Sequence, residues 1–117
     1  MKAVITCEGK DLEVMPDLWE DDVEQLLTFT IRQKNNDAVN LTSGSVNFKM
    51  KEINTATNKV DAACTLTTPA GGVCTYTTVI ADLDAAGVYD AELEVTIGTA
   101  ITTIYLGRFR VQTDLPA

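Results

Sequence analysis

Two stretches near the middle of the chain place an apolar side chain at every second position. They are residues 26–32 (LLTFTIR) and residues 46–51 (VNFKMK). Alternation with a period of two gives a strand one buried face and one wet face, which is typical of antiparallel sheets. The residues 33–37 (QKNND) that follow the first stretch favour turn conformations. The chain is therefore built around two strands that cover a common core.

The same alternation, with turn residues between the runs, predicts the remaining strands. Residues 68–72 (TPAGG) and 98–99 (GT) are the clearest turns. About seven strands at a spacing of roughly 10 residues predict an all-β chain folded as an antiparallel β-sandwich. The expected strands are residues 2–7, a short return over 12–15, and residues 26–32, 46–51, 60–66, 73–79, 89–97 and 100–111.

The last two strands can be paired by counting outward from the Gly98–Thr99 turn. The expected pairs are Val95 with Thr102, Leu93 with Ile104 and Ala91 with Leu106. Beyond Leu106 the apolar residues move from even to odd positions, at Phe109 and Val111. One extra residue, in a β-bulge at Gly107, is therefore needed to bring Phe109 opposite Tyr89. Tyr89 follows the sequence AAGV, which predicts a tyrosine corner with a buried hydroxyl bonded to upstream backbone.

The first 24 residues carry eight acids and two lysines. Pro16 ends any strand there, and Asp17–Glu24 fits either a helical turn or an irregular acidic loop. The acids indicate a solvated segment or, alternatively, a surface that steers a basic partner. Trp19 is expected as a lid on an edge of the sandwich or as an anchor for a partner. The candidate partner-binding residues are Trp19, Glu20, Asp21, Asp22 and Glu24.

Length and charge restrict the class of protein. A chain of 117 residues fits one domain over 1–117, with an acidic segment at 1–24, the sandwich at 25–112 and a tail at 113–117. A net charge of −8 argues against nucleic acid as a partner. We also expect no membrane association and folding in a cytoplasm, because the sequence has no run of ~18 apolar residues and no signal sequence.

The sequence predicts neither an enzyme nor a cofactor. It has no histidine, no nucleophile elbow and no glycine-rich phosphate loop. Asp90, Glu92 and Glu94 share a wet strand face, which could hold a weak cation or form a glycosidase-like pair, although a solvated face is the preferred interpretation. Asp82 and Asp84 lack the spacing of a calcium loop, and no metal site is predicted.

Three cysteines cannot form a complete set of disulfides. A hairpin symmetric about Pro69 would place Cys64 directly opposite Cys74, where a disulfide is geometrically possible. The alternative is two buried thiols, which a reducing cytoplasm favours.

Several motifs resemble the N-terminal domain of tailed-phage baseplate upper proteins, a family that tends to read V-D-L-T-G-A-x-V-x-F-x-M. Residues 27–32 (LTFTIR), 38–42 (AVNLT) and 44–50 (GSVNFKM) carry the first part. Residues 60–63 (VDAA), 72–76 (GVCTY) and 84–95 (DAAGVYDAELEV) continue it, so the resemblance covers about Gln25 to Val111. Asn40 stands where the family usually has Asp, and Thr78 where it often has Trp.

The resemblance implies an immunoglobulin-like sandwich that serves as a structural virion protein of a tailed bacteriophage. The expected role is a docking, adaptor or decoration module of tail, baseplate or capsid, made in the bacterial host cytoplasm and located in the virion. Its expected partners are other virion proteins, in many symmetric copies. The alternative is a non-virion module that binds a surface or carbohydrate, and an enzyme ranks third.

Overall fold

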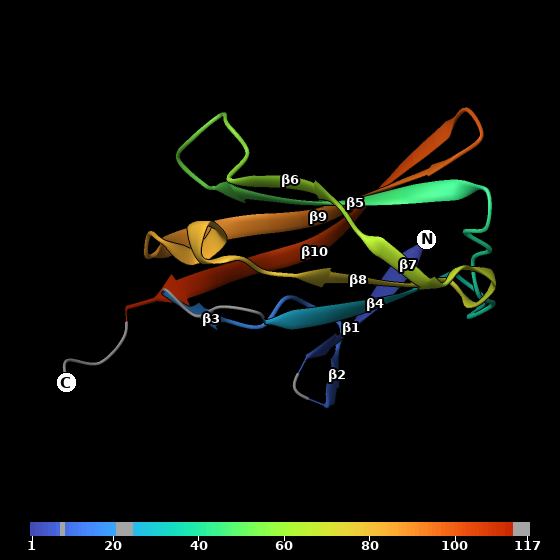
Figure 1. The fold of residues 1–117 in the computed structure, drawn as a ribbon, viewed down its shortest axis with the longest axis horizontal. Helices are drawn as coiled ribbons and strands as arrows, with labels where there is room; N and C mark the ends of the chain where they lie inside the picture. Colours follow the sequence, from blue (N-terminus) through green and yellow to red (C-terminus); the bar gives the residue numbers. More distant parts are fainter. Residues whose placement is uncertain (8, 21–24, 114–117) are drawn as a thin grey trace.

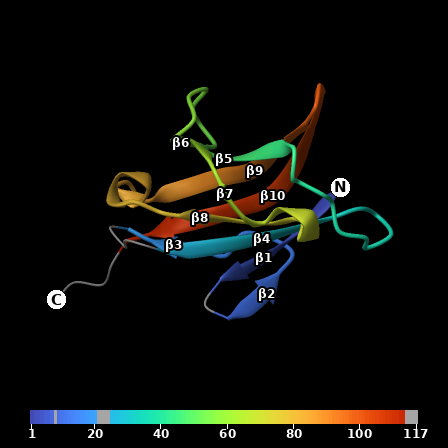
Figure 2. The same cartoon turned by 45° about the vertical axis from the view of Figure 1, so that its right-hand side comes forward.

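The computed structural model describes residues 1–7, 9–20 and 25–113, with only the backbone of Ile80. These residues form ten strands in two five-stranded sheets (Figures 1 and 2). The sheets face each other as a β-sandwich, which confirms the predicted all-β class. The prediction of about seven strands was too low, because short edge strands and one sheet switch add to the count.

The strands follow the immunoglobulin arrangement, in which strands A, B, E and D form one sheet and G, F and C the other. The first sheet runs in the order β2-β1-β4-β8-β7 and the second in the order β3-β10-β9-β5-β6. Every pairing is antiparallel except that of β3 with β10. The first sheet comprises β1 (Lys2–Cys7), β2 (Lys10–Leu12), β4 (Leu26–Arg32), β7 (Thr65–Thr68) and β8 (Val73–Thr77). The second comprises β3 (Leu18–Trp19), β5 (Gly44–Glu52), β6 (Val60–Ala63), β9 (Gly87–Ile97) and β10 (Ala100–Gln112).

Alternation produces the core as predicted. The inward residues of β4 and β5 are buried, and their neighbours in sequence remain partly exposed. Phe29 of β4 and Phe48 of β5 stack across the two sheets with ring centroids 5.8 Å apart. Tyr76 of β8 stacks on the same Phe48 at 5.0 Å. These aromatic contacts join β4 and β8 of the first sheet to β5 of the second.

The β9–β10 hairpin has most of the predicted register. The pairs Val95 with Thr102, Leu93 with Ile104 and Tyr89 with Phe109 are all present. The pairing of Ala91 with Leu106 was wrong, because the register shifts between Tyr105 and Gly107 and Gly107 faces Ala91 instead. Leu106 is therefore the extra residue of the predicted bulge, which lets both Leu106 and Phe109 reach the core.

The predicted strand over residues 60–66 is in fact two strands in different sheets. The chain crosses between the sheets at Cys64, whose N–H donates to the carbonyl of Val46 at 2.8 Å. Beyond it, β7 pairs with β8 and places Leu66 opposite Cys74. The expected register about Pro69 was wrong by two residues, because the short 3₁₀ helix η1 (Pro69–Gly71) and an irregularity before Thr68 displace the hairpin.

The Cys64 and Cys74 thiols are nevertheless neighbours and are not joined by a disulfide. A hydrogen bond with Cys74 and burial raise the pKa of the Cys64 thiol far above its usual range. A thiol held in this neutral form is a poor nucleophile, because the thiolate is the reactive species.

The N-terminal region also differs from expectation. The return strand is β2, at Lys10–Leu12, rather than residues 12–15. Within Asp17–Glu24, which was expected to form a helical turn or a loop, the described residues contain the short strand β3 beside the end of β10. No helix in the described ranges is long and apolar enough to cross a membrane.

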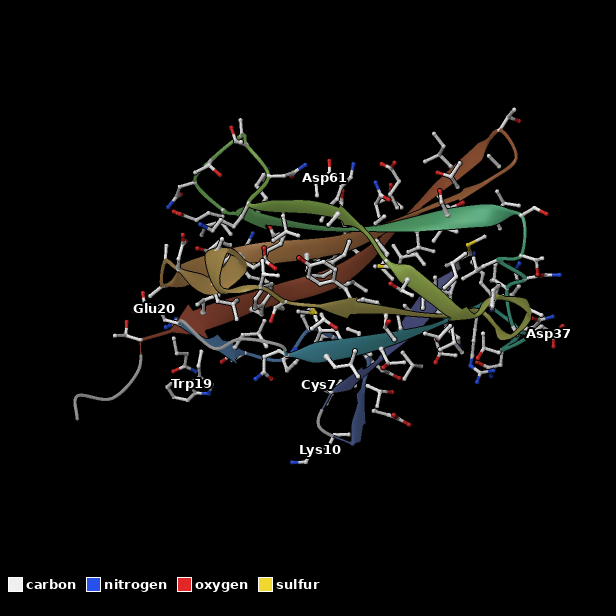
Figure 3. All side chains as sticks on the ribbon, in the orientation of Figure 1. Cys7, Lys10, Trp19, Glu20, Asp37 and Asp61 are labelled. Atoms are coloured by element: carbon white, nitrogen blue, oxygen red, sulfur yellow. The ribbon has the colours of Figure 1, made fainter. Side chains whose placement is uncertain are left out.

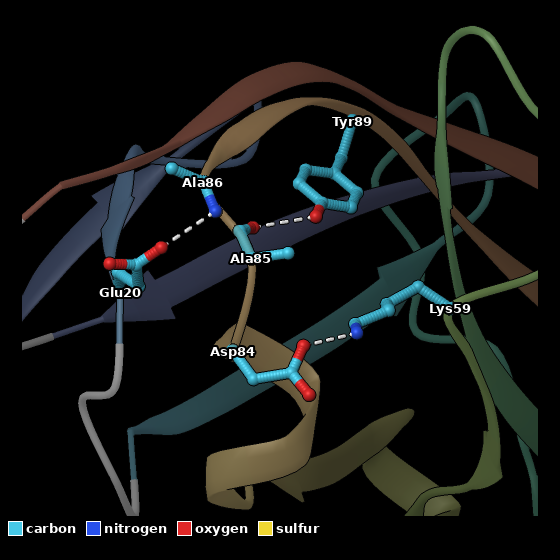
Figure 4. A network of polar contacts seen from close by, with 6 residues as sticks. All are labelled: Glu20, Lys59, Asp84, Ala85, Ala86 and Tyr89. Carbon is cyan, nitrogen blue, oxygen red and sulfur yellow. Dashed lines mark hydrogen bonds and ion pairs between the residues drawn. The ribbon is translucent and has the colours of Figure 1, made fainter.

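The predicted tyrosine corner is present. Tyr89 is only 1% exposed, and its hydroxyl donates to the carbonyl oxygen of Ala85 at 2.7 Å (Figure 4). This contact fixes the loop between η2 (Ile80–Leu83) and β9.

Replacing Tyr89 by Phe removes this bond and leaves the carbonyl of Ala85 without its side-chain donor. We expect Tyr89→Phe to lower the free energy of unfolding by about 1 kcal/mol in urea titrations. Tyr105→Phe is the matched control, because that hydroxyl also donates one hydrogen bond, to Asp90 at 2.7 Å, but does so at the exposed surface, where the loss should cost less than about 0.5 kcal/mol. Equal effects of the two changes would contradict a special role for the corner.

The bulge can be tested at Gly107, which has a φ of +105°. A Cβ there would also approach the Cβ of Val14 to 3.2 Å. We expect Gly107→Ala to cost about 1–3 kcal/mol of unfolding free energy. The turn residue Gly98 has a φ of +61° and open space around it, so Gly98→Ala should cost only about 1 kcal/mol. A smaller loss at Gly107 than at Gly98 would contradict the account.

Candidate docking surface

The segment Met15–Glu20 lies along the C-terminal half of β10. The N–H of Met15 donates to the carbonyl of Leu106 at 2.8 Å, and the N–H of Glu20 donates to the carbonyl of Gln112 at 2.7 Å. Between these points Leu18 pairs with Val111. The segment therefore closes this part of the sheet edge.

Two acids of the segment bind the sandwich directly. One carboxylate oxygen of Asp17 accepts the N–H of Arg110 at 2.9 Å, and the other accepts the side-chain amide of Gln112 at 3.1 Å. The carboxylate of Glu20 accepts the N–H of Ala86 at 2.9 Å, next to the tyrosine corner (Figure 4). Sequence reasoning missed these roles, because the partners lie 66 to 95 residues further along the chain.

Trp19 is held outward by this attachment. Its neighbour Leu18 is buried at 4% exposure, whereas Trp19 is 42% exposed, as the alternation of a strand requires. In Figure 3 the side chains of Trp19 and Lys10 both lie on the lower side of the molecule. Of the predicted partner-binding residues, Trp19 and Glu20 are thus placed, and Asp21, Asp22 and Glu24 lie outside the described residues.

A cavity of about 330 Å³ opens beside Trp19, between the β1–β2 hairpin and the β3 segment. Its lining is mixed, with apolar side chains next to one lysine, one acid and one amide. The lining residues are Cys7, Lys10, Leu12, Pro16, Asp17, Leu18, Trp19 and Gln25. Such a cavity beside an exposed indole can receive a side chain from another molecule.

Two of the three carboxylates on β9, those of Asp90 and Glu94, are paired with cations. Arg108 contacts Asp90 at 3.0 Å, and this bond together with that from the Tyr105 hydroxyl lowers the pKa of Asp90. Lys49 contacts Glu94 at 2.9 Å. Within the described ranges no group of three or more potential ligands could hold a metal ion. The arrangement favours a charge-balanced, solvated sheet face.

Asp82 and Asp84 also have protein partners. Asp82 accepts the hydroxyl of Tyr76 at 2.5 Å and the N–H of Val79 at 3.0 Å. Asp84 forms an ion pair with Lys59 (Figure 4). These carboxylates hold the η2 loop in place.

Comparison with known proteins does not assign this chain to a family. No family model matches the chain, and no curated protein matches it.

The attachment of the segment can be tested by hydrogen exchange. We expect Asp17→Ala to speed exchange of the Arg110 amide at least tenfold, because that N–H loses its acceptor. Asp17→Asn keeps one carbonyl oxygen and should retain part of the protection. Glu13→Ala removes an exposed acid from the same region and is the matched control. Unchanged exchange at Arg110 in Asp17→Ala would show that the contact does not hold the segment.

Proposed function

We propose that this chain is a structural docking module of a tailed-phage virion and that it binds a neighbouring virion protein through the surface around Trp19. The observation that carries the proposal is an exposed indole on a fixed edge strand, next to a cavity of about 330 Å³. The assignment to a virion rests on the sequence resemblance described above.

The physical argument begins with the preorganisation of Trp19. Its strand is bonded to β10 on both sides of the indole, by Asp17 and by Glu20. Little conformational freedom remains to be lost when a partner covers the indole, so more of the contact energy appears as affinity. Tryptophan is among the residues that most often dominate binding energy at protein interfaces.

Charge supplies selectivity for the partner. The chain carries a net charge of −8, and eight of its acids lie in the first 24 residues. An acidic surface attracts a basic partner, and the attraction weakens as salt screens it. Many symmetric copies in a particle would strengthen a modest contact through multivalency.

The test is to count copies of this chain in purified particles by quantitative mass spectrometry. We expect a fixed copy number for the wild type and at least a tenfold reduction for Trp19→Ala. Ile53→Ala removes another exposed apolar side chain and should be incorporated normally. Normal incorporation of Trp19→Ala would place the docking surface elsewhere, and absence of the wild-type chain from particles would overturn the virion assignment.

The alternative, a surface- or carbohydrate-binding module, uses the same exposed indole. Its test is binding to a glycan array, where a signal that disappears in Trp19→Ala, with no chain in particles, would favour it.

A further inference from the structure

The edge of β10 that faces away from β9 has two different halves. From Leu106 to Gln112 it is covered by the segment Met15–Glu20. From Ala100 to Tyr105, no strand within the described parts of the chain pairs with it. A hollow of about 540 Å³ separates Thr103, Ile104 and Tyr105 from the start of the chain. Its other lining residues are Met1, Lys2, Ala3, Val4, Glu13, Arg32 and Asn36. This half of the edge is open.

The turn before β10 decides which backbone groups point to that edge. Gly98 has a φ of +61° and is the first residue of a two-residue loop, as in a type II′ turn. The flanking pair Ile97 and Ala100 therefore exchanges hydrogen bonds, and the pattern alternates from there. It follows that Ile101, Thr103 and Tyr105 direct their N–H and C=O groups away from β9.

The residues of the open half carry no protection against pairing with another strand. Residues 100–105 read AITTIY, without charge or proline, in a chain of which 22% is charged. Edge strands are usually protected by charged residues, proline or a bulge. In β10 the bulge at Leu106 and the first charged residue, Arg108, come only after Tyr105. Ile101 is 64% exposed and Tyr105 is 61% exposed.

We propose that two copies of this chain pair antiparallel through the open half of β10, with the two-fold axis at Thr103. In this register Ile101 of each copy lies opposite Tyr105 of the other, and the two copies of Thr103 lie opposite each other. The three outward residues of each copy then exchange six backbone hydrogen bonds. Pairs of aromatic with β-branched residues, and Thr with Thr, are favourable across antiparallel strands.

A second copy fits this edge because the edge is complementary to itself. All three outward residues lie opposite an outward residue of the second copy only when the axis passes through Thr103, which is the centre of the set. Two carboxylates of β9 lie beside the open half, Glu94 opposite Thr103 and Glu92 opposite Tyr105. That of Glu94, which is next to the proposed axis, is paired with Lys49 at 2.9 Å. This pairing reduces the repulsion at the axis between two chains of charge −8.

The dimer should be weak when isolated, because one six-residue strand pair buries less than the ~1,200 Å² of a standard interface. It does not depend on the proposed virion function or on Trp19, which lies on another part of the molecule.

Sedimentation velocity tests the proposal with a pair of charge variants. The wild type should shift from monomer toward dimer between ~10 µM and ~1 mM, the range expected for a small interface. Thr103→Lys and Thr103→Glu should each remain monomeric, because residue 103 would face a like charge in its counterpart. An equimolar mixture of the two variants should dimerise again, since opposite charges then meet at the axis.

Thr65→Lys is the matched control, because Thr65 is an exposed threonine on β7, the edge strand of the other sheet. It should dimerise as the wild type does. A wild type that stays monomeric, a Thr103→Lys variant that still dimerises, or a mixture no better than its components would overturn the proposal.

Hydrogen exchange gives a second readout that needs no variant. Amides of Ile101, Thr103 and Tyr105 should gain protection as the concentration rises. Those of Thr102 and Ile104 donate to β9 and should be protected throughout. Concentration-independent exchange of all five amides would overturn the proposed strand pairing.

Discussion

The stacking of Phe48 between Phe29 and Tyr76 is the contact on which the sandwich depends. The column joins one sheet to the other through ring centroids 5.8 Å and 5.0 Å apart. Phe29 and Phe48 are fully buried, and aromatic pairs contribute beyond the area they bury. With no disulfide between Cys64 and Cys74, packing rather than a covalent bond fixes how the two inner faces meet.

The second constraint is the attachment of the N-terminal segment to β10. Hydrogen bonds to an ionised carboxylate are stronger than those between neutral groups, and Asp17 accepts two of them. The segment is long enough to cover only part of the edge. One consequence is an indole held outward at a fixed place, and the other is an uncharged stretch of β10 left open. Both surfaces thus follow from where one short segment is bonded.

Charge on this protein therefore has two different uses. The carboxylates of Asp90 and Glu94 are matched by Arg108 and Lys49 on neighbouring strands. Asp17 and Glu20 act within the fold as acceptors for backbone N–H groups. The number of acids in the sequence does not show which carboxylates form ion pairs and which accept backbone N–H groups. The role of each carboxylate depends on the strand that lies next to it.

Local pattern by itself determined the class of fold, the inward faces of β4 and β5, the tyrosine corner and the need for a bulge near Gly107. These depend on side-chain period, turn chemistry and residues close in sequence. The sequence also singled out Trp19. Only the tertiary structure decided that Asp17 and Glu20 hold it, that the chain changes sheets at Cys64, and which half of β10 stays open. Those outcomes depend on contacts between residues far apart in the chain, and a one-dimensional pattern carries no record of which segments become neighbours.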